Sequence, residues 1–241
     1  MAHRYFTNNI VGNTAKITGD DANHLIKVLR VKIDDTLNLF DNFGMDYIVK
    51  ITNISPSNIE CLILSKTKND TEPDINVTLY VGYPKSDKLE FIIQKAVELG
   101  AVKIVPFFSK YCVVTPKKEE QKNIRYNKIA YEAVKQSGRG IIPTVELPIS
   151  FKEMINQQSN YDLSLFCYEA QDKDSSIPLN TLLNQSKNIS IITGSEGGFD
   201  ENEAELALQN TNVISLGKRI LRCETAPIVA LTSVMLLTDN L

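Results

Sequence analysis

The chain has 241 residues and a mass of 27.0 kDa, which predicts one or two domains. Its 26 basic and 29 acidic residues give a formal net charge of −3, which excludes binding of nucleic acid through bulk positive charge but allows a local basic patch. No apolar run approaches the roughly 18 residues of a membrane span, and four widely separated cysteines indicate reduced thiols in a cytoplasmic protein, without a metal site.

The first 70 or so residues have a β-rich pattern. Strands are predicted over 15–18, 36–40, 46–54 and 59–64, where β-branched and apolar residues alternate between Gly, Asn, Asp and Pro turns. One helix follows Asp20 and Asp21, and the polar residues 66–74 form a predicted linker. A small barrel or sandwich is therefore expected over residues 1–72, followed by a second domain over 73–241.

From residue 75 onward, strands and helices alternate. Asp87 and Glu90 predict a capping box at the start of a helix that ends at Gly100. Strands are expected at 77–82, 102–108, 161–167, 189–193 and 213–216, and further helices at 123–137, 150–158, 179–185, 200–209 and 225–237. Repeated βα units predict an α/β fold with a largely parallel sheet covered on both faces.

Charge is unevenly distributed along this second part. Residues 85–140 contain 12 basic and 6 acidic residues, whereas residues 141–213 contain 3 basic and 11 acidic residues. The pattern is compatible with two solvated faces, or with a basic surface that binds a polyanion.

Two segments could carry chemistry. Residues 193–199 read TGSEGGF and lie between a predicted strand and a helix, where glycines allow a ligand to approach the backbone. A tight turn without a ligand is the alternative, but Glu196 adds nothing to such a turn. Residues 215–226 place Lys218, Arg219 and Arg222 beside Glu224 and Thr225, so an arginine could bind a phosphate or carboxylate. An ordinary helix cap is the alternative there.

Both segments resemble the RsmE family of 16S rRNA (uracil-N3)-methyltransferases in the SPOUT superfamily. The likeness covers almost the whole chain, including residues 3–6, 24–30, 90–100, 194–199 and 216–226 in this order. Two departures stand out, because the family usually has proline at the position of Ser195 and threonine at that of Cys223. We expect both replacements to tune loop stiffness without abolishing binding.

The resemblance implies a fold and a reaction. The expected fold is a small N-terminal PUA-like β-barrel followed by a SPOUT α/β domain with a C-terminal trefoil knot, which pairs as a homodimer. The expected reaction is S-adenosylmethionine-dependent methylation of uridine 1498 in 16S rRNA, within the 30S subunit. A SPOUT methyltransferase of another RNA and a non-catalytic rRNA-binding assembly factor are the alternatives. A nicotinamide-dependent oxidoreductase is a weaker alternative, because the G-x-G-x-x-G dinucleotide-binding motif is missing from this sequence.

The resemblance also implies positions for the site. The cofactor-binding set is Thr193, Gly194, Glu196, Gly197, Gly198, Leu216, Gly217, Ile220, Leu221 and Arg222. The RNA-binding set is Arg4, Lys27, Arg30, Lys85 and Arg139, with Lys88 as a weaker candidate.

Methylation of uracil N3 requires removal of its proton and stabilisation of the resulting anion. Arg222 is the predicted stabiliser of negative charge on the uracil oxygens. Glu196 or Glu224 is the predicted proton acceptor, and the sequence does not choose between them.

Overall fold

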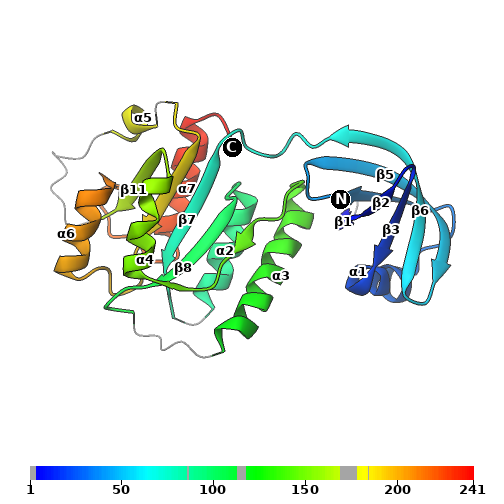
Figure 1. Cartoon of the computed structure of the whole chain (residues 1–241), viewed down its shortest axis with the longest axis horizontal. Coiled ribbons are helices and arrows are strands. Elements are labelled where there is room, and N and C mark those ends of the chain that lie inside the picture. The colour runs from blue at the N-terminus through cyan, green and yellow to red at the C-terminus, as the bar shows by residue number, and fades with distance from the viewer. Residues whose placement is uncertain (1–3, 86, 113–117, 169–177, 184) are drawn as a thin grey trace. The chain divides into compact units, whose positions relative to one another are not determined.

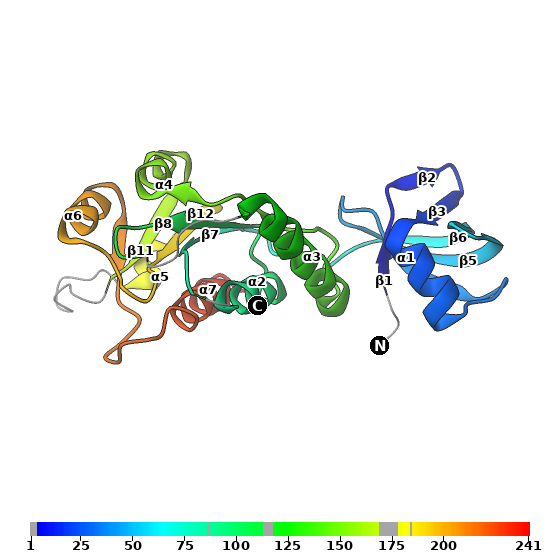
Figure 2. The same ribbon diagram turned by 90° about the horizontal axis from the view of Figure 1, so that it is seen from below.

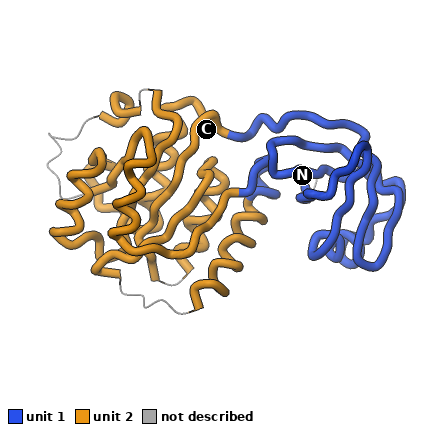
Figure 3. The backbone as a smooth tube through the Cα atoms, in the orientation of Figure 1, with its two compact units in different colours: residues 1–72, 134–142 blue, residues 73–133, 143–241 orange. Residues whose placement is uncertain are grey.

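The chain divides into two compact units in a computed structural model that describes residues 4–85, 87–112, 118–168, 178–183 and 185–241. Unit 1 contains residues 1–72 and 134–142, and unit 2 contains residues 73–133 and 143–241 (Figure 3). The sequence predicts a single boundary at 72/73 and gives no sign that residues 134–142 return to the first unit. That domain assignment remains a prediction, while the return of the chain is a feature of the structure.

Unit 1 is built on a six-stranded sheet with the order β1-β4-β5-β6-β3-β2, in which only the β1–β4 pair is parallel (Figure 1). The strands are β1 (Arg4–Phe6), β2 (Asn9–Val11), β3 (Thr14–Thr18), β4 (Thr36–Phe40), β5 (Met45–Ser55) and β6 (Asn58–Lys68). The short strands β1 and β2 were not predicted. The linker prediction began too early, because residues 66–68 continue β6 and pair with β5.

The core of unit 1 forms because alternate residues of the strands face one side. Val49 and Ile51 on β5 are fully buried, as are Leu39 on β4 and Ile59 on β6. Leu25 adds to this core from the junction of helix α1 (Gly19–His24) with a π-helical turn (Leu25–Leu29).

Unit 2 contains a parallel sheet with the order β10-β8-β7-β12-β11-β13, and β9 pairs with β8. The strands are β7 (Asn76–Gly82), β8 (Lys103–Phe108), β9 (Thr144–Val145), β10 (Ile149–Ser150), β11 (Leu163–Cys167), β12 (Asn188–Thr193) and β13 (Asn212–Ile214). Helices α2 (Lys88–Glu98) and α7 (Ala226–Leu237) cover one face, and α4 (Phe151–Asn156) and α6 (Glu201–Asn210) cover the other (Figure 2). The remaining helices are α3 (Glu119–Ser137) and α5 (Leu179–Leu182).

The structure contradicts the predicted capping box at the start of α2. Asp87 makes no side-chain cap at α2, because its backbone (φ −87°, ψ 4°) is not in the extended conformation of a capping residue, and Glu90 pairs with Arg125. Capping boxes do form at Ser150 with Glu153 and at Asp200 with Glu203, which fixes the starts of α4 and α6.

The fold brings the two candidate segments to one edge of the sheet. Strands β12 and β13 run parallel to β11 on either side of it, so their carboxyl ends lie together. Residues 194–199 leave the end of β12, and residues 215–225 leave the end of β13 and lead into α7. Ligands commonly bind at this edge of open α/β sheets.

Candidate active site

A cavity of about 630 Å³ lies at this edge of unit 2, among the segments that follow β11, β12 and β13. This volume is within the usual range of small-molecule sites. Nine of the predicted cofactor-binding residues line it: Gly194, Glu196, Gly197, Gly198, Leu216, Gly217, Ile220, Leu221 and Arg222. Thr193 does not line it, because this side chain is buried at the end of β12, where Oγ1 donates a hydrogen bond to the Tyr80 carbonyl.

The loop after β12 depends on closely packed glycines. A Cβ on Gly82 would lie 2.3 Å from the backbone nitrogen of Ser195, so only glycine at the end of β7 allows this loop to lie against the strand. A Cβ on Gly197 would lie 2.7 Å from Cβ of Tyr111. The glycines therefore fix the loop against two neighbouring segments and leave its backbone facing the cavity.

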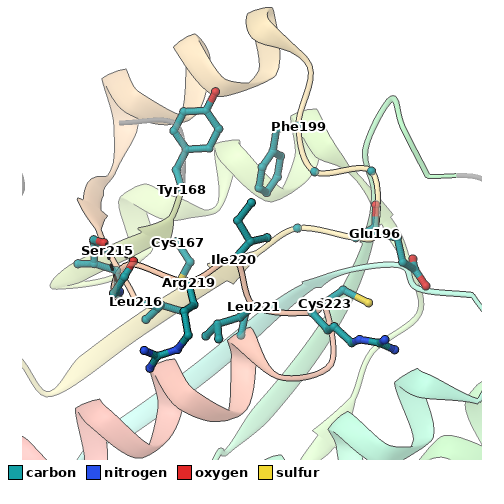
Figure 4. Close-up of a pocket in the computed structure, with 18 of the residues that line it drawn as sticks. Cys167, Tyr168, Glu196, Phe199, Ser215, Leu216, Arg219, Ile220, Leu221 and Cys223 are labelled. Carbon is teal, nitrogen blue, oxygen red and sulfur yellow. Dashed lines mark hydrogen bonds between the residues drawn. The ribbon is translucent and has the colours of Figure 1, made fainter. Parts of the chain in front are cut away.

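One side of the cavity is aromatic and apolar. Figure 4 shows Ile220 extending toward Phe199, with Tyr168 beside them. The rings of Phe166 and Phe199 make an edge contact with centroids 4.8 Å apart, and Tyr168 stacks on Phe166 at 5.3 Å. Tyr168 was not predicted as part of the site, and Phe199 was included only as the end of the candidate segment 193–199, without a role in binding the cofactor. The position of Tyr168 directly after β11 was an available signal.

The opposite side of the cavity is charged. The Lys88 ammonium lies 2.9 Å from Oε1 of Glu196 and 3.3 Å from Oε2 of Glu224, so a single cation joins both predicted proton acceptors. Lys88 and Glu196 line the cavity, whereas Glu224 lies beside it. Lys88, predicted only as a weaker RNA contact, is therefore a central member of the site.

Both carboxylates are stabilised in their charged form. Partial burial acts to raise the pKa of Glu196, but hydrogen bonds from Lys88 and from the backbone N–H groups of Glu196 and Lys85 outweigh it and lower this pKa. Burial likewise opposes ionisation of Glu224, and its backbone N–H, the Cys223 thiol and Lys88 lower its pKa. The pKa of Lys88 is raised, chiefly by the hydrogen bond to Glu196.

The Cys223 thiol lies within this cluster and is held in its protonated form. Its Sγ donates to Oε2 of Glu224 at 3.2 Å, and burial together with this hydrogen bond raises the pKa of Cys223 to about 12. Cys223 is thus protonated at neutral pH, and the thiolate needed for nucleophilic chemistry is scarce.

The predicted RNA-binding residues fall into two groups. Lys27, Arg30 and Lys85 are exposed. Arg139 is only 2% exposed and pairs with Glu72 at 2.7 Å, and Arg4 pairs with Asp46 and donates to the Arg139 carbonyl. Arg4 on β1 thus joins residues 134–142 to the sheet of unit 1, and Arg139 joins them to Glu72.

The basic stretch 85–140 is largely compensated by acids. Eight of its cations pair with carboxylates in the described part of the chain: Lys88, Lys95, Lys103, Lys110, Lys122, Arg125, Lys135 and Arg139. By contrast, Lys85, Lys218 and Arg219 near the cavity form no ion pair with a described residue. Within unit 2, these three residues near the cavity therefore keep their charge available to a polyanion.

No group of three or more His, Cys, Asp and Glu side chains that could hold a metal ion occurs among the described residues. No helix within the described ranges combines the length and apolar character required to cross a membrane.

Comparison with known proteins identifies relatives across the whole length. The sequence profile of the RNA methyltransferase domain matches residues 71–235, and that of the RNA methyltransferase PUA domain matches residues 17–64. The chain is 34% identical over 235 residues to the ribosomal RNA small subunit methyltransferase E of Bacillus subtilis, covering 95% of this chain and 92% of the relative. It is 35% identical over 232 residues to that of Mesomycoplasma hyopneumoniae, covering 95% and 97%.

The fold has the same relatives. A crystal structure of the Neisseria gonorrhoeae ribosomal RNA small subunit methyltransferase E bound to S-adenosyl methionine matches with a TM-score of 0.87 and 29% identity, covering 98% of both chains. The α/β unit with its cavity, the N-terminal PUA-like unit and these matches agree. The chain belongs to the ribosomal RNA small subunit methyltransferase E family of S-adenosylmethionine-dependent RNA methyltransferases.

Proposed function

We propose that this protein methylates N3 of uridine 1498 in 16S rRNA, within the 30S subunit in the cytoplasm, with S-adenosylmethionine as methyl donor. The observation that carries the proposal is a cavity that has glycine-loop backbone, an aromatic side and a charged cluster together at the sheet edge. Family membership supplies the substrate class, and the position of the nucleotide follows from the resemblance to the RsmE enzymes.

The residues around the cavity fit this cofactor. Its planar adenine suits the apolar side formed by Tyr168, Phe199 and Ile220, and its positively charged portion suits the side with Glu196. When bound, S-adenosylmethionine supplies an activated methyl group. We propose that the predicted residues that line the cavity contact the cofactor. Thr193 does not contact it, and instead anchors the start of the loop through its hydrogen bond to the Tyr80 carbonyl.

The chain's own residues would then prepare the base for reaction. The exposed Arg222 guanidinium is positioned at the cavity to stabilise negative charge on the uracil oxygens. A carboxylate of the Lys88 cluster is available to take the N3 proton, because both are ionised at neutral pH. Holding the base and the methyl donor in line supplies much of the remaining acceleration.

RNA binding is proposed for the exposed cations Lys27, Arg30 and Lys85. Lys218 and Arg219 extend this set, because they are exposed beside the cavity. Arg4 and Arg139 were expected in the same role, but their ion pairs favour a structural one.

A homodimer is proposed from the apolar surface of α7. Leu236 and Leu237 on this helix are 60% and 50% exposed, and Phe91 on the adjacent helix α2 is 49% exposed. Burial of such a face against a second copy would remove it from water. Light scattering on the purified protein tests this, and a monomer at micromolar concentration would contradict it.

The decisive experiment is transfer of labelled methyl groups from S-adenosylmethionine to 30S subunits that lack the modification, with the product nucleoside identified by mass spectrometry. We expect 3-methyluridine at one 16S position. Transfer only to another RNA would favour a different substrate. Binding of 30S subunits without binding of S-adenosylmethionine or transfer would favour an assembly factor.

A further inference from the structure

The two carboxylates joined by Lys88 have different surroundings. Oε1 of Glu196 accepts from the Lys88 ammonium at 2.9 Å and from the Lys85 backbone N–H at 3.1 Å, and Oε2 accepts from that same N–H at 3.4 Å. Both oxygens of Glu196 are therefore engaged, and its side chain forms part of the cavity wall. This carboxylate ties the residues after β7 to the glycine loop.

Glu224 is held differently, by its own backbone N–H and by two neighbouring side chains. Oε2 accepts from the Cys223 thiol at 3.2 Å and lies 3.3 Å from the Lys88 ammonium. The nearest cation to Oε1 is the Arg222 guanidinium, at 3.9 Å, which is beyond hydrogen-bond distance. Glu224 is not part of the cavity wall, but its neighbours Arg222 and Cys223 are.

We propose that Glu224 is the catalytic proton acceptor, that Glu196 is a wall of the cofactor cavity, and that Lys88 is a positioning residue that holds Glu224 in place. The inference rests on the proposed function and assigns roles within its site. A group that accepts a proton from the RNA base has to lie beside the group that stabilises negative charge on that base. Oε1 of Glu224 lies 3.9 Å from the Arg222 guanidinium, whereas both oxygens of Glu196 are held by Lys88 and the Lys85 backbone N–H.

In the proposed step, Glu224 accepts the proton from uracil N3–H and becomes a carboxylic acid. The N3 electron pair forms the new bond to the transferred methyl carbon, whose bond to sulfur breaks and leaves its electron pair on sulfur. Arg222, beside Glu224, stabilises the negative charge that develops on the uracil oxygens before the methyl bond is complete.

The charged groups around Glu224 set how Lys88 acts. Lys88 contacts Glu224 from α2. Glu196, in the loop after β12, contacts the same ammonium, and Arg222 and Cys223 lie next to Glu224 on its own segment. Loss of the ammonium would leave two carboxylates without their shared cation, which raises the pKa of Glu224. Because the unprotonated carboxylate is the active form, the acid limb of the pH–rate profile would then move to higher pH.

The test uses single-turnover methyl transfer to unmodified 30S subunits over a range of pH, together with the Kd for S-adenosylmethionine. For Glu224→Gln we expect a rate constant lower by about 100-fold or more with an unchanged Kd. For the matched variant Glu196→Gln we expect the larger effect on Kd and the smaller effect on rate. Lys88→Met should move the acid limb to higher pH, and Lys88→Arg should restore it.

Each result decides a part of the proposal. A Glu224→Gln rate within about threefold of wild type, or a greater rate loss in Glu196→Gln, overturns the assignment of the proton acceptor. A uniform rate loss in Lys88→Met with an unmoved acid limb overturns the positioning role of Lys88. Wild-type protein that transfers no methyl group to 30S subunits overturns the proposed function instead, so the two failures are distinguishable.

Discussion

Arg222 lies at the cavity with 83% of its side chain exposed, and its nearest carboxylate is Glu224 at 3.9 Å. So exposed a side chain contributes little to packing, and a long exposed ion pair adds little stability. We therefore propose that Arg222 acts through the charge that it presents to a ligand.

Replacement of Arg222 by alanine should lower kcat for methyl transfer by about 100-fold, because a donor to developing negative charge is lost. The urea unfolding midpoint should not change. Arg125→Ala is the matched control, since Arg125 is also exposed and paired with a carboxylate but lies away from the cavity. Equal kcat values for the two variants would remove Arg222 from the reaction.

Arg139, unlike Arg222, is buried, and it is closely paired with a carboxylate. Its side chain is 3% exposed, and its guanidinium nitrogens donate to both oxygens of Glu72, which also accepts from the backbone N–H groups of Gly140 and Ile141. Removal of one partner from a buried ion pair leaves the other charge uncompensated.

We expect Arg139→Met to destabilise the protein by about 3 kcal/mol or more in urea unfolding. Lys16→Ala, which breaks the exposed pair with Glu60 in the same unit, should cost less than about 1 kcal/mol. Unchanged stability with weakened RNA binding in Arg139→Met would instead support the role predicted from the sequence.

At the scale of elements, the site depends on how closely β7 and the loop after β12 approach each other. Gly82 makes this possible, because a Cβ there would overlap the backbone of Ser195 and could not be relieved by a side-chain rotation. The loop would have to move away from the strand, and the cavity wall would move with it.

Gly82→Ala should therefore weaken binding of S-adenosylmethionine at least tenfold, as measured by calorimetry, and lower the Tm. Gly12→Ala provides a control for loss of a glycine, since Gly12 lies in unit 1 with φ of +57° and open space around it. That variant should lose some stability from backbone strain but keep its affinity for the cofactor. Equal cofactor affinity in both variants would argue against the close packing as the reason for glycine at position 82.

At the scale of the whole molecule, the basic stretch seen in the sequence is not a basic surface in the structure. The net charge is −3, and the cations of residues 85–140 are mostly paired, partly with acids from distant segments such as Glu146, Asp200 and Glu72. Lys85, Lys218 and Arg219 near the cavity keep their charge available to phosphates.

Affinity for rRNA should consequently fall steeply with salt, with a slope that depends on the cavity cations. Removing both Lys218 and Arg219 should reduce the slope of log K against log salt by about 0.7 per lost phosphate contact on single-stranded RNA. The control pair Lys95→Ala with Lys103→Ala should keep the wild-type slope, because both lysines are already paired. If both pairs of substitutions lower the slope equally, the RNA-binding surface includes residues 85–140 and is not limited to the cations near the cavity.

The sequence by itself determined the α/β class, most of the long elements and the two segments that line the cavity, while the domain boundary at 72/73 stays a prediction. These depend on local periodicity, turn residues and motif order, which are written along the chain. Recognition of the motifs also predicted nine of the residues that line the cavity, and the family comparisons confirmed that recognition.

Only the tertiary structure decided which charges act together. It joined Lys88 to Glu196 and Glu224 across more than a hundred residues of chain, placed Tyr168 beside Phe199, and buried Arg139 against Glu72. It also replaced the expected cap at Asp87 with an ion pair between Glu90 and Arg125. Such pairings depend on the distance between atoms in space, and charge interactions fall off over a few ångströms whatever the separation in sequence.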